Sequence, residues 1–232
     1  MNIPANNKQN KNDMATEHAL KKTIVACLGS SSTAARGPYD WIQELEQRPH
    51  NASFLFYRFA HGGDLAYNGL QRLPKVIACR PDRVIVQLGG NDVLALISIT
   101  MTRFVRLTKR PPHEPSPEWY HEVIRKIVYH LKRETSARIA LCSEIPIGED
   151  PNSANPFQAE LNRRMIEYNT ILKDIVSAEG ISYLPLYERM QELILTSPGH
   201  AFTSFELLPF YRDLFRHLVL RKSNDEIDLL NG

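Results

Sequence analysis

The chain has 232 residues, of which 43% are hydrophobic and 23% charged, as in a soluble globular protein with one full-sized core. Its formal net charge of +2 argues neither for nor against a nucleic-acid partner, but the lysines over residues 8–22 are too sparse for a nucleic-acid patch, so no such partner is expected. No stretch approaches the roughly 20 apolar residues that cross a bilayer. Residues 1–20 are polar and lack the apolar core of a secretory signal. We therefore expect a cytoplasmic protein with a disordered leader over 1–20.

Apolar, β-branched or aromatic segments predict five strands, at residues 23–27, 53–59, 84–88, 137–142 and 181–186. Apolar residues at helical spacing predict helices between them, at residues 40–46, 65–78, 118–133 and 158–179, with Gly180 as a left-handed cap. Further helical stretches are expected at 187–195, 205–220 and 224–230. Strands that alternate with helices indicate parallel βαβ units. The sequence therefore predicts an α/β protein with three layers, α/β/α, around a five-stranded parallel sheet.

The cysteines, Cys27, Cys79 and Cys142, are three in number and cannot all pair, and they show no CxxC spacing. Cys27 and Cys142 fall in predicted strands, which favours small buried thiols in a reducing compartment. No metal site and no cofactor are expected.

A small polar cluster follows each of the first three predicted strands, at 29–32 (Gly-Ser-Ser-Ser), 62–64 (Gly-Gly-Asp) and 89–92 (Gly-Gly-Asn-Asp). Parallel strands place their carboxyl ends at one edge of the sheet, where the ligands and catalytic groups of open α/β proteins gather. A hydroxyl nucleophile there needs donors aimed at the oxyanion that forms on attack. The hydroxyl and backbone N–H of Ser31, the backbone N–H of Gly63 and the amide of Asn91 would meet that need. Taken alone, the Ser cluster is typical of a turn.

Together the segments LGSSST, HGGDLAYNGLQRLP and PDRVIVQLGGNDV resemble the first three conserved blocks of the SGNH (GDSL-type) hydrolase family, in order and in strand–helix context. The resemblance covers residues 22–186. It implies a flavodoxin-like fold and a serine hydrolase of small-molecule esters that acts through an acyl-enzyme. It also implies Ser31 as the nucleophile and Gly63 and Asn91 as oxyanion-hole donors.

This chain departs from the family at its nucleophile motif, which usually reads Gly-Asp-Ser. Ser30 stands where the family has Asp. Ser30 and Ser32 therefore stay open as alternatives to Ser31 for the attacking hydroxyl.

The family's base is the His of an Asp-x-x-His motif after the fifth strand, and residues 186–232 contain no such motif. His200 is the candidate base, although Ser197 and not Asp lies three residues before it. His217 follows Asp213 by four residues in a helical stretch, the spacing of an ordinary surface pair. His61 adjoins the proposed oxyanion hole.

We expect residues 21–232 to form an SGNH hydrolase-like domain that lacks the C-terminal Asp-x-x-His segment. Two hypotheses follow from that expectation. The chain is an active ester hydrolase, or it is a truncated or catalytically impaired relative that binds ligands or partners.

Residues 93–110 are apolar and then basic, and a Pro-rich connection follows at 111–117. We expect a helix packed on the sheet with a solvated basic end; a lid, or a surface for acyl chains or a membrane, is the alternative. A third hypothesis is a flavodoxin-like binding site for phosphate or a nucleotide, built from the loop of residues 29–33. It lacks the P-loop lysine and leaves Gly63 and Asn91 unexplained.

Overall fold

The computed structural model describes residues 22–35, 39–146 and 155–196. Within these residues, parallel strands form a five-stranded sheet in the order β2-β1-β3-β4-β5. The strands are β1 (Thr23–Gly29), β2 (Phe54–Ala60), β3 (Arg83–Gln87), β4 (Arg138–Cys142) and β5 (Ser182–Leu184). This is the flavodoxin-like strand order, and it confirms the predicted parallel α/β architecture.

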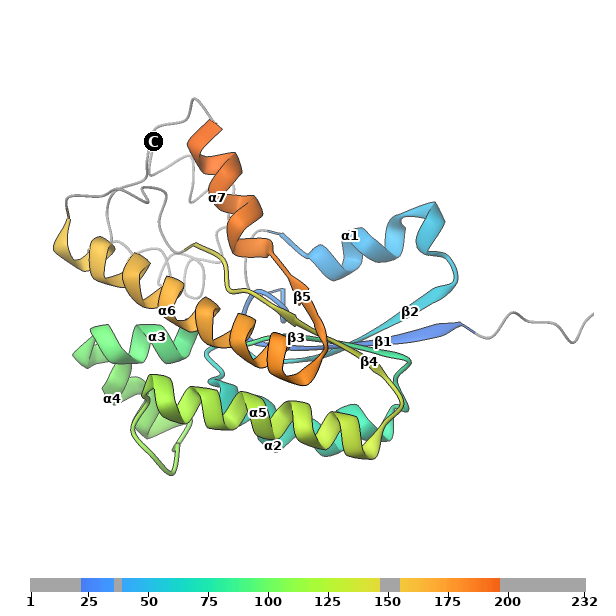
Figure 1. Ribbon diagram of the computed structural model, residues 1–232, viewed down its shortest axis with the longest axis horizontal. Coiled ribbons are helices and arrows are strands. Elements are labelled where there is room, and N and C mark those ends of the chain that lie inside the picture. The colour runs from blue at the N-terminus through green and yellow to red at the C-terminus, as the bar shows by residue number, and fades with distance from the viewer. Residues whose placement is uncertain (1–21, 36–38, 147–154, 197–232) are drawn as a thin grey trace, which may run out of the picture.

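Helices cover both faces of the sheet (Figure 1). They are α1 (Trp41–Gln47), α2 (Ala66–Ala78), α3 (Gly90–Ile97), α4 (Ile99–Thr108), α5 (Pro117–Glu134), α6 (Pro156–Glu179) and α7 (Leu186–Thr196), with a single 3-10 turn, η1 (Pro49–Asn51). In Figure 1, α1 lies on one side of the sheet and α2 and α5 lie on the other. The layers are therefore α/β/α, as the sequence predicts.

The alternation of side chains along β1 explains why both faces must be covered. Ala26 and Leu28 pack into the main core with α2, α5 and α6, whereas Val25 and Cys27 pack against Ile42 of α1. Successive side chains of a strand point to opposite faces, so a strand that is apolar at every position needs a layer on each side. The apolar run that predicted β1 is thus the run of a central strand.

Local signals set the ends of several helices. Asp40 caps α1 by accepting hydrogen bonds from the backbone N–H groups of Ile42 and Gln43. Gly180 ends α6 in the left-handed conformation, at φ 62° and ψ 38°, which confirms the predicted cap.

Two predictions from the sequence differ from the structure. The fifth strand ends at Leu184 rather than at residue 186, because Pro185 has no N–H for the ladder and α7 begins at Leu186. The segment 93–110 is not one helix on the sheet. The extended backbone of Ser98 (φ −126°, ψ 115°) separates α3 from α4, and Val105 of α4 packs with Leu65 and Ala95.

The cysteines are free, and Cys27 and Cys142 are buried, as predicted. Burial raises the pKa of both thiols to about 12, so neither is a thiolate at neutral pH. No helix within the described ranges is long and apolar enough to cross a membrane. The expected leader at 1–20 and the helical stretches expected at 205–220 and 224–230 lie outside the described residues.

The buried face of α5 offers a test of the core. Ile127 is fully buried, whereas Ile166 of α6 is 52% exposed. We expect Ile127→Ala to lower the free energy of unfolding by about 2–5 kcal/mol, through lost burial and the cavity left behind. The matched Ile166→Ala is expected to change it by less than about 1 kcal/mol. Urea unfolding measures both, and equal effects would contradict this packing.

Candidate active site

The carboxyl ends of β1, β2 and β3 meet at one edge of the sheet. Gly29, the last residue of β1, is paired with Ala60 of β2 and Gln87 of β3. A side-chain contact then joins the loop after β1 to β3, since Ser32 Oγ donates to Gln87 Oε1 at 3.4 Å. The three polar clusters that the sequence singled out therefore begin at the same level of the sheet.

The loop after β1 turns back tightly on the strand. A Cβ atom on Gly29 would lie 2.0 Å from Thr33 Oγ1, so the turn has no room for a side chain at that position. The backbone N–H of Ala34 donates to the carbonyl of Ser30 at 2.9 Å and closes the turn. Ser30 and Thr33 are buried inside this turn, at 4% and 1% exposure.

The hydroxyl groups of this loop differ in their hydrogen-bond partners. Ser32 Oγ and Thr33 Oγ1 both donate to Gln87 Oε1, at 3.4 and 3.3 Å. Ser31 is half-buried, and its hydroxyl makes no hydrogen bond to any residue that the structure describes. Among the candidate nucleophiles Ser30, Ser31 and Ser32, Ser31 is thus the one that is neither buried nor bound to Gln87.

Gly63 lies in the loop after β2 with φ +73°, in the left-handed region that favours glycine. Lys109, which follows α4, fixes this loop. Its Nζ donates to the Gly62 carbonyl and to Asp64 Oδ1, each at 2.8 Å. The peptide group between Gly62 and Gly63 is thereby fixed by the hydrogen bond to its carbonyl oxygen.

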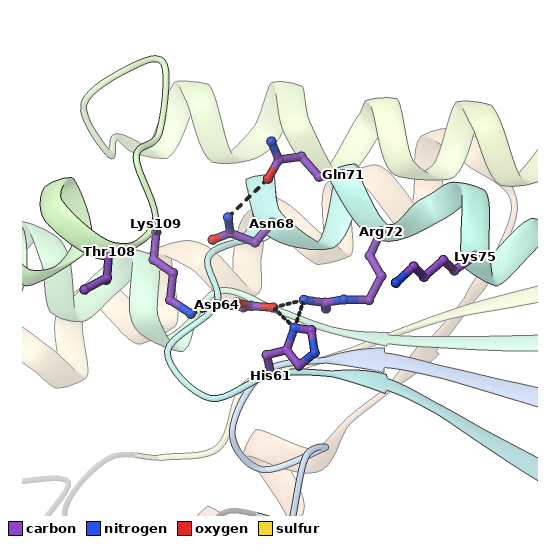
Figure 2. A pocket seen from close by; sticks show the side chains of 8 residues that line it. All are labelled: His61, Asp64, Asn68, Gln71, Arg72, Lys75, Thr108 and Lys109. Atoms are coloured by element: carbon purple, nitrogen blue, oxygen red, sulfur yellow. Dashed lines mark hydrogen bonds and ion pairs between the residues drawn. The ribbon is translucent and has the colours of Figure 1, made fainter.

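Asp64 is the carboxylate around which this loop is arranged (Figure 2). Its side chain is 4% exposed and forms ion pairs with Arg72 of α2 and with Lys109. Arg72 also donates to the Phe59 carbonyl at 3.2 Å. We call Asp64, Arg72 and Lys109 the Asp64 cluster. In the sequence, Asp64 falls in a polar cluster without an assigned role, and no motif singles out Arg72 or Lys109.

Asn91 stands in the first turn of α3 and is oriented by the same loop. Its Nδ2 donates to the Asp64 carbonyl at 2.9 Å, which links the ends of β2 and β3. The amide has a second N–H, and no hydrogen bond to a described residue occupies it. Gly89, just before α3, has φ +143°, and a Cβ there would meet Tyr120 Oη at 2.9 Å. The backbone that leads into Asn91 therefore requires glycine.

His61 points into the Asp64 cluster. Its Nδ1 lies 2.7 Å from an Arg72 guanidinium nitrogen, and 73% of its side chain is exposed. A guanidinium can only donate, so Nδ1 accepts and the imidazole proton sits on Nε2. The lone pair that a general base would use is occupied in this arrangement. His200, His217 and Asp213 lie outside the described residues.

Two buried acids lie beneath the start of α3, and sequence reasoning missed their role. Asp92 is 2% exposed and Glu144, after β4, is 4% exposed. Asp92 Oδ2 accepts from the Ala66 backbone N–H at 3.0 Å, while a Cβ on Gly90 would lie 3.3 Å from Glu144 Oε2. The two carboxyls thus flank the backbone that carries Asn91.

Burial dominates the ionisation of both acids. It raises the pKa of Asp92 to about 8, against the opposing hydrogen bond from Ala66 and with a further rise from Glu144. Burial likewise raises the pKa of Glu144 to about 7, although a hydrogen bond from the Gly90 backbone opposes the rise. Asp92 is therefore protonated at neutral pH, and Glu144 titrates close to it.

These pKa values predict a pH-dependent stability. The unfolded chain releases both protons at ordinary carboxyl pKa values, whereas the folded chain holds them up to pKa values of about 7 and 8. The folded state binds more protons in that window, so the free energy of unfolding falls as pH rises from about 5 to about 8. Glu144→Gln is expected to reduce the loss by up to about 1.4 kcal/mol per pH unit.

Urea unfolding across that pH range measures this dependence. Glu192→Gln is the matched control, because the Glu192 side chain is 65% exposed. A slope that both Glu144→Gln and Asp92→Asn leave unchanged would contradict the assignment.

The strand order is the one that the resemblance to a known hydrolase family implies. A model of the GDSL-like Lipase/Acylhydrolase family matches residues 25–203. The chain belongs to this family, which confirms the resemblance found in the sequence and makes it a member of a family of ester hydrolases.

Solved structures of low sequence identity share the fold. Axe2, an acetylxylan esterase from Geobacillus stearothermophilus, superposes with a TM-score of 0.60 at 17% identity, covering 76% of this chain and 83% of Axe2. The acetyl xylan esterase AlAXEase gives 0.57 at 18% identity, with 74% and 81% covered. LAE5, an alpha/beta hydrolase from the metagenome of Lake Arreo, Spain, gives 0.57 at 17%, with 75% and 82% covered. Comparison with curated proteins finds no match.

Proposed function

We propose that the protein is a serine hydrolase of ester bonds in which Ser31 is the nucleophile. The observation that supports this assignment is the difference in burial and hydrogen bonding among the hydroxyl groups that follow β1. Gln87 engages Ser32 and Thr33, whereas Ser31 is half-buried and makes no hydrogen bond to a described residue. β1 also lies between β2 and β3, whose ends supply the other two candidate groups.

The proposed donors are held in place before substrate arrives. Lys109 fixes the Gly62 carbonyl next to Gly63, and the Asp64 carbonyl orients the amide of Asn91. Donors that need no rearrangement stabilise the negative charge of a tetrahedral intermediate strongly.

The chemistry follows in two steps. Ser31 Oγ attacks the ester carbonyl carbon and gives its proton to a base, and the oxyanion accepts from the N–H groups of Ser31, Gly63 and Asn91. The ester C–O bond breaks, the alcohol leaves with the proton, and water then releases the acid from the acyl-enzyme. His200 is the candidate base. His61 is not proposed for that role, because Arg72 occupies its Nδ1.

Covalent labelling tests the nucleophile. A fluorophosphonate probe is expected to add once to the protein, as seen by intact mass, and Ser31→Ala is expected to abolish the adduct because the attacking oxygen is gone. Ser32→Ala is the matched control and should keep it. Labelling that persists in Ser31→Ala and disappears in Ser32→Ala would transfer the role to Ser32.

Hydrolysis of p-nitrophenyl acetate tests the oxyanion hole and the base. Asn91→Ala is expected to lower kcat by about 10²–10³-fold, through loss of one oxyanion donor. His200→Ala is expected to lower the rate far more than His61→Ala. The reverse order would reject His200 and restore His61 as the candidate.

A further inference from the structure

A pocket of about 430 Å³ lies beside the loop of Gly63, between α2 and the residues that end α4 (Figure 2). Its charged lining consists of Arg72, Lys75 and Lys109 around Asp64, and we call it the basic pocket. The proposed mechanism places no bound group in this pocket, although Lys109 of its lining also holds the loop of Gly63. Its lining is polar, which does not suit an acyl chain.

The charges of the basic pocket do not balance. Arg72 and Lys109 are only 11% and 16% exposed, and both pair with the single carboxylate of Asp64. Lys75 is exposed at the edge of the pocket and adds a third cation, which forms no ion pair with any residue in the described ranges. The positive charge that Asp64 leaves unbalanced on the largely buried Arg72 and Lys109 is costly, and a bound anion would offset that cost.

One of the cations that line the pocket has a hydrogen-bond donor to spare. Lys109 Nζ uses two of its N–H groups, on the Gly62 carbonyl and Asp64 Oδ1, and an ammonium has three. Figure 2 shows Lys75 extending from α2 toward Arg72, with Lys109 on the opposite side of Asp64. An anion in the pocket would therefore lie near Arg72 and draw on Lys75 or on the remaining N–H of Lys109.

The basic pocket adjoins the proposed oxyanion hole. A Cβ on Gly63 would lie 3.3 Å from Lys109 Cε and 3.6 Å from its Nζ. Lys109 thus lines the basic pocket and at the same time contacts the loop that carries the proposed Gly63 donor.

We propose that the basic pocket binds an anionic group, a carboxylate or a phosphate, that the ester carries within a few bonds of its reacting carbonyl. The link to the ester rests on the proposed function, whereas binding of the anion does not. The same chemistry would also bind a separate small anion, and the two sources are distinguished by experiment.

Lys75 is the residue to change, because Arg72 and Lys109 also hold the loop of Gly63. Lys75→Gln removes the charge and keeps a polar side chain on α2. The matched control is Lys126→Gln on α5, where the lysine pairs with Glu122 and is 54% exposed. Both variants lower the net charge of the chain equally, so a difference between them reports on the pocket.

Direct binding is measured on Ser31→Ala, which needs no activity. Inorganic phosphate and succinate are titrated separately by NMR, and both are expected to bind, more weakly as NaCl rises from about 20 to about 200 mM. Adding Lys75→Gln is expected to raise the Kd about three- to fivefold, while Lys126→Gln leaves it unchanged. Absence of saturable binding, or an equal effect of both lysines, would overturn anion binding at this pocket.

Substrate preference assigns the source of the anion. The chain with Ser31 intact is given p-nitrophenyl acetate and the mono-p-nitrophenyl ester of succinic acid, which carries a free carboxylate. We expect a higher kcat/KM for the succinate ester and a three- to fivefold loss of that preference in Lys75→Gln, with the acetate rate unchanged. A preference that does not depend on Lys75, together with binding that does, would assign a separate anion and overturn the substrate assignment. Anion binding without hydrolysis of either ester would overturn the proposed function and leave the pocket in place.

Discussion

The arrangement of the candidate site depends on the buried carboxylate of Asp64. It pairs with Arg72 of α2 and with Lys109 after α4, while its own backbone carbonyl accepts from Asn91 of α3. Three helices are thus tied to one loop at the end of β2. Removing a buried partner of such a cluster leaves an uncompensated charge, which costs several kcal/mol, so the loop geometry is strongly determined.

The candidate site depends on backbone conformations that favour glycine and on side chains that hold those conformations in place. Gly63 and Gly89 have positive φ, and Lys109 and Tyr120 fill the space that side chains at those positions would need. The protonated form of Asp92 keeps one charge out of the layer beneath Asn91. With Asp92 neutral, an anionic oxygen in the proposed oxyanion hole would meet less negative charge from beneath.

The features that could be predicted from the sequence are those that depend on the local pattern of apolar and polar residues. The parallel sheet followed from apolar runs that alternate with amphipathic helices, and the placement of the three polar clusters at one edge of the sheet followed from that topology. The ion pair of Lys109 with Asp64 was not predictable, because it spans 45 residues and depends on the break at Ser98, which the continuous apolar run after residue 93 conceals. The proximity of Asp92 and Glu144 likewise requires the pairing of β3 with β4.

The break at Ser98 has a consequence for how this protein can be altered. α4 is bounded by an extended residue at its start and by the left-handed Arg110 just beyond its end, and it packs mainly through Val105. α4 packs mainly against α3 rather than on the sheet, so we expect exchanges within residues 99–108 to leave the strand register unchanged. Lys109 is the exception, since it reaches across to the Gly62 carbonyl. A change at Lys109 would therefore reach the loop of Gly63, whereas the side chain that α4 itself contributes to the pocket is Thr108.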